Sequence, residues 1–298
     1  MLDMEDVVWR RAGTGFALHV PRLSLRPGIT LLAGRNGAGK TSLLELLGTA
    51  AFPQEGRITY DGMTADRDLP TIRASIGFVP AGAELYEEMT PVKLLRYLAE
   101  LKGGAPESEL DGLLAAFRLQ PFAGRKIKTL AHGVRQRIAL AQALIGSPPY
   151  LFLDEPLNAL DSLERLSFIR LLSAYGRKRT VLVSTHELNE WEAWAQRVLW
   201  LDDGRPLFYG SASDWTSGLP LAIWEGFATV RQYRAFDPAA VVHMRSEPAG
   251  CLLRLMAAEP PGPGFEPQAP TLEDAYFIRS RCQRRRSCPP AERSNSAG

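Results

Sequence analysis

Alternating hydrophobic and polar positions begin the chain, and short unbroken apolar runs follow. The alternation predicts two edge strands, and the apolar runs predict buried strands. Edge strands are expected at 2–9 and 16–25, buried strands at 29–33, 150–153 and 180–184, and further short strands at 57–61 and 75–79. Helical spacing of leucines at 41–47 and about 162–175 separates the runs. Strands that alternate with helices predict an α/β fold with a mostly parallel sheet and an antiparallel β edge.

The stretch from about 88 to 147 has a different character and predicts a helical insertion. Thr90-Pro91 combines an N-cap hydroxyl with proline at the first helical position. Leucines at helical spacing follow it, and further helices are expected at 107–117 and 134–145.

The pattern changes again after about 210. Short strands are expected at 221–230 and 240–257, and a capped helix at 271–279. We therefore predict a main domain over 1–210, a small αβ accessory region over 211–279, and a basic, disordered tail over 280–298.

Composition and charge exclude some classes of protein. Of the 298 residues, 45% are hydrophobic and 23% are charged, as in ordinary globular proteins. A net charge of +2 gives no general attraction to nucleic acid, so none is expected as a partner. We see no secretory signal and no apolar run long enough to span a bilayer. The three cysteines have no metal-binding spacing, and we expect free thiols in a reducing compartment.

A glycine-rich loop follows the predicted strand at 29–33. It fits the P-loop pattern G-x-x-x-x-G-K-[ST], whose backbone N–H groups surround phosphate oxygens. The lysine supplies a positive charge to the β- and γ-phosphates, and the hydroxyl of the next residue can ligate Mg²⁺. The loop and the start of its helix comprise Gly34, Arg35, Asn36, Gly37, Ala38, Gly39, Lys40, Thr41 and Ser42. The pattern predicts a site for ATP and Mg²⁺.

Two acidic residues end the predicted strand at 150–153. Asp154 can hold Mg²⁺, and Glu155 is placed to act as general base for an attacking water. Pro156 breaks the strand, so both carboxylates are expected at its carboxyl end, where open α/β sheets bind ligands.

Together with three later motifs, these residues resemble the ATP-binding subunit of ABC transporters over about 2–210. The motifs match the family's signature, D-loop and switch histidine. They are the segment around Ala131, His132 and Gly133, the D-loop ending at Asp161, and His186 after Ser184-Thr185. The resemblance implies a P-loop NTPase fold with Glu155 and His186 as catalytic residues.

The resemblance also implies partners and a location. Family members form head-to-tail dimers in which each ATP lies between one subunit's P-loop and the other's signature. We therefore expect a second ATP-binding subunit, identical or different, and a membrane-spanning ABC permease. The chain itself is expected to be cytoplasmic, held at the inner face of the cell membrane by the permease. Thr271-Leu272-Glu273-Asp274-Ala275-Tyr276 resembles the closing segment of ATPases that serve ABC-2-type exporters, which favours export.

Three departures from the family pattern qualify these expectations. Ala131 and His132 stand where the family has Ser and Gly, and Ala131 has no side-chain donor for phosphate. Ala81 stands where the family has a Gln that contacts Mg²⁺ and water, and Glu84 and Glu87 are candidate substitutes. Third, Ala12 stands near the position at which the family often has an aromatic residue that stacks on adenine. Trp9 and Phe16 are the candidates for that role in this chain.

These departures leave alternatives open. The chain could be a nearly non-hydrolysing ATP-binding partner in a heterodimeric complex, with slow turnover. A soluble ABC ATPase acting on ribosomes or DNA is less favoured, because such proteins carry two ATPase cores or a long coiled coil, and this sequence shows one core and no sustained heptads.

Overall fold

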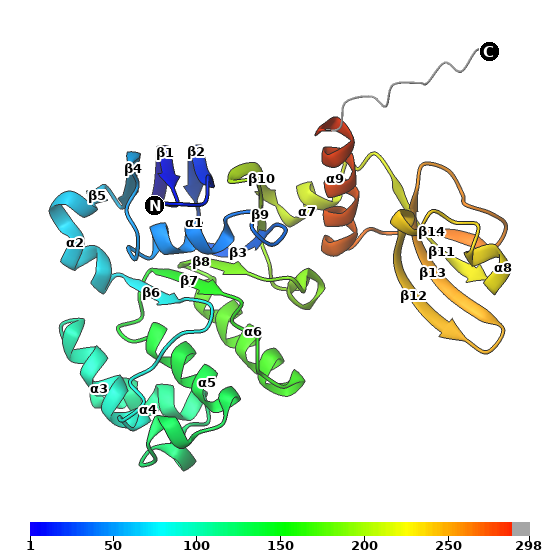
Figure 1. The fold of residues 1–298 in the computed structure, drawn as a ribbon. Helices are drawn as coiled ribbons and strands as arrows, with labels where there is room; N and C mark the ends of the chain where they lie inside the picture. Colours follow the sequence, from blue (N-terminus) through cyan, green and yellow to red (C-terminus); the bar gives the residue numbers. More distant parts are fainter. Residues whose placement is uncertain (288–298) are drawn as a thin grey trace. The chain divides into compact units, whose positions relative to one another are not determined.

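A computed structural model describes the backbone of residues 1–287 and the side chains of residues 1–283 (Figure 1). The described chain forms two compact units. Unit 1 comprises Met1–His186 and Ala193–Ser211, and unit 2 comprises Glu187–Glu192 and the chain from Ala212 on. The chain therefore leaves unit 1 directly after His186, passes briefly through unit 2, and returns.

A six-stranded sheet forms the centre of unit 1, in the order β10-β9-β3-β8-β7-β6. Its strands are β3 (Gly28–Ala33), β6 (Ile76–Val79), β7 (Tyr150–Asp154), β8 (Thr180–Ser184), β9 (Arg197–Asp202) and β10 (Arg205–Ser211). All neighbouring pairs are parallel except β9 and β10. Every residue of β3, β7 and β8 is buried, which explains their unbroken apolar runs. The predicted α/β class with a mostly parallel sheet is confirmed.

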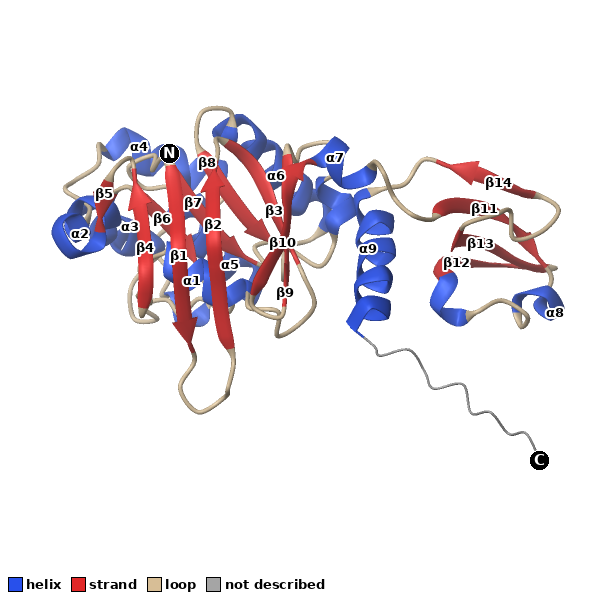
Figure 2. Ribbon diagram, turned by 90° about the horizontal axis from the view of Figure 1, so that it is seen from above, coloured by secondary structure: helices blue, strands red, loops and turns tan. Residues whose placement is uncertain are grey.

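A second, antiparallel sheet has the order β2-β1-β4-β5 (Figure 2). It is built from β1 (Leu2–Arg10), β2 (Ala17–Leu25), β4 (Glu55–Tyr60) and β5 (Met63–Thr64). The buried residues alternate along β1 and β2, as the sequence pattern predicts. Helix α1 (Lys40–Leu47) packs its leucines into one hydrophobic core with both sheets. The core therefore fixes α1, and with it the start of α1, where the glycine-rich loop ends.

Helices form the predicted insertion and cover the sheet. The insertion contains α3 (Pro91–Leu101), α4 (Glu107–Ala116) and α5 (His132–Ala143), with short 3₁₀ turns at Gln120–Phe122 and Ile127–Thr129 (Figure 1). Helix α6 (Ser162–Gly176) follows β7 and lies outside the insertion. The Thr90 hydroxyl caps α3 by accepting a hydrogen bond from the N–H of Lys93 at 3.4 Å. Helix α2 (Ala65–Ala74) was not predicted. Pro70 lies inside it, and Asp68 has non-helical dihedral angles where the helix kinks.

Unit 2 contains an antiparallel sheet of order β12-β13-β11-β14 and short helices. Its elements are η3 (Leu188–Trp191), α7 (Ala212–Thr216), β11 (Ala222–Ala228), α8 (Val230–Tyr233), η4 (Pro238–Ala240), β12 (Val241–Glu247), β13 (Gly250–Ala257), β14 (Phe265–Gln268) and α9 (Leu272–Ser287). The buried carboxylate of Asp274 pairs with the partly buried Arg254, 2.6 Å between Oδ2 and Nη2, and ties α9 to β13. Trp215 Nε1 donates to the carbonyl of Leu272 at 2.9 Å.

One expectation for this region is wrong. Residues 280–287, predicted to be disordered, continue α9. Arg and Gln are good helix formers, and Arg281 donates to Asp237 Oδ2 at 2.7 Å and to the carbonyl of Ala239 at 3.0 Å. The rest of the predicted tail, 288–298, lies outside the described residues. Within the described part of the chain, no helix has both the length and the apolar character needed to cross a membrane.

Candidate active site

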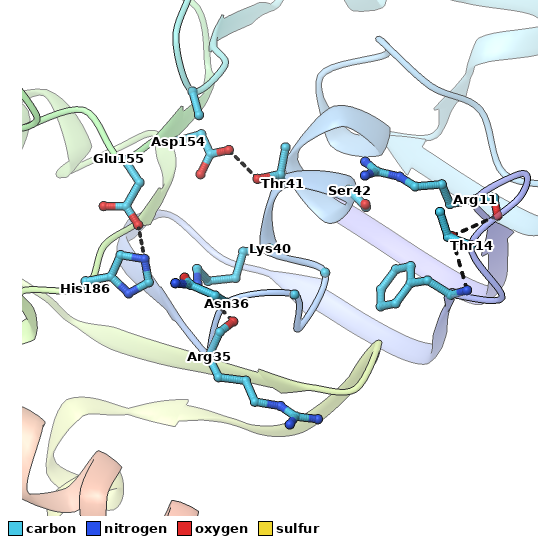
Figure 3. Close-up of a pocket in the computed structure, with 14 residues that line it drawn as sticks. Arg11, Thr14, Arg35, Asn36, Lys40, Thr41, Ser42, Asp154, Glu155 and His186 are labelled. Atoms are coloured by element: carbon cyan, nitrogen blue, oxygen red, sulfur yellow. Dashed lines mark hydrogen bonds and ion pairs between the residues drawn. The ribbon is translucent and has the colours of Figure 1, made fainter.

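One cavity of about 510 Å³ brings together most of the residues that the sequence singles out (Figure 3). They come from the loop after β3, the start of α1, and the ends of β6, β7 and β8. The lining residues are Arg11, Thr14, Phe16, Arg35, Asn36, Gly37, Gly39, Lys40, Thr41, Ser42, Ala81, Asp154, Glu155 and His186. The carboxyl ends of parallel strands thus converge on the glycine-rich loop, which is where ligands of such sheets bind.

Lys40 is buried and held by the loop that precedes it. Its Nζ donates to the carbonyl of Gly34 at 2.7 Å and of Arg35 at 3.3 Å. Burial lowers the pKa of Lys40, and the nearby carboxylates of Glu155 and Asp154 oppose that shift. The Lys40 ammonium can therefore bind an anionic ligand in this cavity.

Two loop residues do not line the cavity but hold the loop in place. A Cβ on Gly34 would overlap the carbonyl oxygen of Leu201, so only glycine fits there. Ala38 is buried, and its carbonyl accepts a hydrogen bond from the N–H of Gly204 at 3.0 Å. The turn between β9 and β10 therefore supports the loop from behind.

Asp154 is buried at the end of β7, and two hydroxyl groups bind its carboxylate. Thr41 Oγ1 donates to Asp154 Oδ2 at 2.7 Å, and Ser184 Oγ donates to Oδ1. Ser184 also accepts a hydrogen bond from the N–H of Glu155 at 2.9 Å. The sequence pattern indicates Ser184 only as the residue two positions before the motif histidine. Its position at the end of the neighbouring strand could be recognised only once the strand order was known.

Glu155 and His186 are in contact at one end of the cavity, with Oε1 and Nε2 3.0 Å apart (Figure 3). Burial raises the pKa of Glu155; His186 and Lys40 oppose the shift, and the charge of Asp154 adds to it. Glu155 also has a positive φ of 49°, a strained conformation for a non-glycine residue. The structure thus holds a carboxyl group of raised pKa beside an imidazole, a pair able to exchange a proton with water.

The signature residues and Asp161 do not line this cavity. Ala131 and His132 are exposed at the start of α5, and His132 lines a separate cavity with Glu84, Glu87 and Arg135. Asp161 caps α6, where its Oδ1 accepts from the N–H of Glu164 at 2.8 Å. Its position therefore has a structural reason that is independent of any ligand.

Gly133 has a packing reason of its own. A Cβ there would lie 2.8 Å from the carbonyl oxygen of Ala159. In addition, Gln136 Nε2 donates to the carbonyl of Pro156 at 3.0 Å. The start of α5 is thus packed directly on the loop that follows Asp154 and Glu155.

Ala81 lines the cavity with a side chain that can neither ligate a metal nor bind water. Glu84 and Glu87, the candidate substitutes, line the separate cavity beside His132. The structure therefore places no carboxylate from this segment among the groups around Lys40.

The loop after β3, the acids after β7 and the strand order define a P-loop nucleoside triphosphatase. Comparison with known proteins identifies the family. The family model described as "ABC transporter" matches residues 18–158. The zinc import ATP-binding protein ZnuC of Roseobacter denitrificans is 34% identical over 214 residues, which are 69% of this chain and 79% of that protein. The chain belongs to the ABC transporter family as an ATP-binding domain.

Other relatives place the chain within a diverse family. The human retinal-specific phospholipid-transporting ATPase ABCA4 is 29% identical over 67% of this chain, which corresponds to only 9% of that protein. The bacitracin transport ATP-binding protein BcrA of Enterococcus faecalis is 30% identical over 63% of this chain and 60% of its own length. The dimeric structure of MJ0796, a bacterial ABC transporter cassette, matches with a TM-score of 0.63 at 26% identity, over 71% of this chain and 98% of that one.

Proposed function

We propose that this chain binds ATP with Mg²⁺ and hydrolyses it to power transport by a separate membrane-spanning ABC permease. One observation carries the proposal: Lys40, Thr41, Asp154, Glu155 and His186 line a single cavity of about 510 Å³. That volume is in the range of sites for small molecules and cofactors.

In this proposal the phosphates lie over the loop from Gly34 to Thr41. Lys40 exchanges its contacts with loop carbonyls for phosphate oxygens, and the start of α1 adds its partial positive charge. Arg35, Asn36, Gly37, Gly39 and Ser42 line the same part of the cavity, and Gly34 and Ala38 hold the loop.

The donors at this site also fit Mg²⁺. Thr41 Oγ1 and Asp154 Oδ2 are oxygen ligands of the kind that Mg²⁺ prefers, and they lie 2.7 Å apart. Mg²⁺ would neutralise charge on the phosphates. Ser184 holds the Asp154 carboxylate in place by donating a hydrogen bond to its other oxygen, Oδ1.

Glu155 is the proposed general base. His186 lies beside it and is proposed to contact the γ-phosphate. A raised carboxyl pKa makes Glu155 a better proton acceptor when ionised than an ordinary glutamate. His186 lies 3.0 Å away and can orient Glu155 and the attacking water.

A second ATP-binding subunit completes the site in this proposal. Ala131, His132 and Gly133 open α5 at the surface, so their N–H groups are available to a γ-phosphate bound by a partner. Asp161 is also exposed. The fold's likeness to a dimeric bacterial cassette supports a head-to-tail pair.

Exposed aromatic and aliphatic side chains support a docking site for the permease on α3 and the segment before it. Tyr86 and Leu101 are 54% and 66% exposed, and Tyr86 packs edge-on against Tyr97 at 5.6 Å between ring centroids. Such side chains on one helix and the segment before it are typical of a protein interface. Docking there would hold the chain at the inner face of the membrane.

We further propose export, by a permease of the ABC-2 type. The segment from Thr271 to Tyr276 supports this subtype, and the likeness to a bacitracin transport ATP-binding protein agrees with it. Transport assays of the complex in inside-out vesicles test the direction. Uptake of cargo into such vesicles on adding ATP supports export, and release of preloaded cargo contradicts it.

Two variants of the purified complex test the core of the proposal. Lys40→Ala is expected to lose ATP binding, whereas Glu155→Gln is expected to keep it and to lose hydrolysis by about 10²–10⁴-fold. Retained hydrolysis in both variants contradicts the assignment. Arg10→Ala is the control, because Arg10 pairs with Glu55 away from the cavity.

A second candidate function is a nearly non-hydrolysing ATP-binding partner in a heterodimer. Ala81 and the Ala131-His132 pair favour it, because each removes a polar contact to the reacting groups. Single-turnover hydrolysis by the complex separates the two functions. Restoring the family residues by Ala131→Ser with His132→Gly is expected to speed turnover roughly 10- to 100-fold if a charge-assisted hydrogen bond is regained. An unchanged rate contradicts a defective signature.

A further inference from the structure

The cavity has two chemically different ends. Lys40, Asp154, Glu155 and His186 occupy one end, and Arg11, Thr14 and Phe16 occupy the other (Figure 3 labels all but Phe16). The first end is charged and suits phosphates. The second combines a planar guanidinium, a hydroxyl and an aromatic ring, which are groups that bind a heterocyclic base.

The two aromatic residues considered from the sequence differ in their positions relative to this end of the cavity. Trp9 does not line the cavity. Phe16 does, but its ring packs on the hydrophobic core and approaches Gly39, where an added Cβ would lie 2.7 Å from Phe16 Cζ. The tip of the Phe16 ring therefore points toward the phosphate loop, and Arg11 offers a second flat surface at this end of the cavity.

Arg11 supplies that surface. Its Cζ lies 5.7 Å from the centroid of the Trp9 ring, so an indole supports the guanidinium. Its Nη2 lies 3.9 Å from Glu45 Oε2 on α1, the helix that begins at the phosphate loop. The side chain is 50% exposed and lines the cavity. A guanidinium is flat and stacks on aromatic faces, which an ammonium does not.

The loop that carries Arg11 is itself ordered by hydrogen bonds. The N–H of Arg11 donates to the carbonyl of Phe16 at 3.0 Å, and the Thr14 hydroxyl donates to the carbonyl of Arg11 at 3.2 Å. The backbone of Arg11 is thus held by hydrogen bonds, and its side chain contacts the Trp9 ring and Glu45, so less ordering is needed when a ligand binds.

We propose that Arg11 is the residue on which the nucleobase stacks, with the Trp9 ring behind it. This inference rests on the proposed ATP binding and names the group that binds the base. Stacking uses the π-face that every base has, so ATP and GTP are expected to bind within about threefold of each other.

Affinities of the purified protein for Mg-ATP and for inorganic tripolyphosphate with Mg²⁺ test the proposal. Arg11→Ala is expected to weaken Mg-ATP about two- to thirtyfold and to leave tripolyphosphate unchanged. Arg11→Tyr, which keeps a flat surface without charge, is expected to retain ATP affinity. Arg11→Lys, which keeps the charge without the plane, is expected to resemble Arg11→Ala. Arg10→Ala is the matched control and is expected to change neither affinity.

The possible failures are distinguishable. If Arg11→Lys keeps ATP affinity and Arg11→Ala loses affinity for both ligands, Arg11 binds phosphate and the stacking proposal is overturned. A preference for GTP above tenfold also overturns it, because it indicates reading of the base edge. Wild-type protein that binds neither ligand overturns the proposed function itself.

Discussion

Ser184→Ala is the most direct test of how the acidic end of the site is held together. Ser184 is fully buried at the end of β8, and its hydroxyl makes two hydrogen bonds to the residues that end β7. It donates to the carboxylate of Asp154 and accepts from the N–H of Glu155 at 2.9 Å. Alanine keeps the backbone and removes both bonds.

The size of the effect follows from those two bonds. A hydrogen bond to a charged group contributes about 1.5–3 kcal/mol, and a neutral one about 0.5–1.5 kcal/mol. We expect Ser184→Ala to lower the free energy of unfolding by about 2–4 kcal/mol. We also expect slower ATP hydrolysis, because Asp154 and Glu155 lose the group that fixes them relative to each other.

Urea denaturation of the nucleotide-free protein measures the stability loss. With a denaturant slope of about 3 kcal/mol per M, the midpoint is expected to fall by roughly 1 M at an unchanged slope. Ser167→Ala is the matched control, since Ser167 is exposed on α6 and bonds only to a carbonyl of its own helix. A midpoint for Ser184→Ala that equals the control's, with normal hydrolysis, refutes the reasoning.

Three further predictions concern other parts of the chain. Burial raises the pKa of Glu155, so its ionised form destabilises the fold above the ordinary carboxyl pKa of 4.5. Glu155→Gln is therefore expected to raise the melting temperature of nucleotide-free protein at pH 8. This gain in melting temperature is expected to shrink as the pH falls toward 4.5. Gly133→Ala is expected to destabilise the protein by about 1–3 kcal/mol in urea, since its Cβ would lie 2.8 Å from a backbone carbonyl, whereas Gly112→Ala on α4 has open space and is expected to stabilise it slightly. Asp274→Ala removes the buried partner of Arg254 and is expected to lower the unfolding free energy of unit 2 by about 3 kcal/mol, which proteolytic susceptibility of that unit also reports.

Local chemistry explains why much of the fold could be predicted. The central strands are buried on both faces, so their sequence is apolar throughout, and the capped helix at Pro91–Leu101 begins with a hydroxyl and a proline. The features that were missed have no such local pattern. Helix α2 carries a proline in its interior, and the part of α9 beyond Arg279 follows from contacts of Arg281 with a distant loop.

The residues of the candidate site likewise fall into those that a local pattern predicts and those that depend on the tertiary fold. The glycine-rich loop is a contiguous pattern, and the acids after β7 follow a recognisable strand. The contacts of Ser184 depend on β8 lying between β3 and β7, an order that spacing along the chain does not reveal. The position of Arg11 in the cavity likewise depends on how β1 and β2 pair, because their register brings the connecting loop beside α1.

The positions of the departures from the family pattern decide at which stage each would act. Ala81 lines the cavity and lies beside the groups proposed for Mg²⁺ and water, so its effect belongs to a single subunit and is present in the monomer. Ala131 and His132 are exposed outside the cavity, so in the proposed dimer their effect would arise when a second subunit brings its nucleotide to α5. In the proposed function, the isolated chain binds ATP through residues of its own cavity, among them Lys40 and Thr41, which match the family, whereas the altered signature would weaken closure of the dimer. We therefore propose that the two departures would slow turnover while leaving binding by the phosphate loop intact, and an ordinary turnover rate of the complex would contradict this proposal.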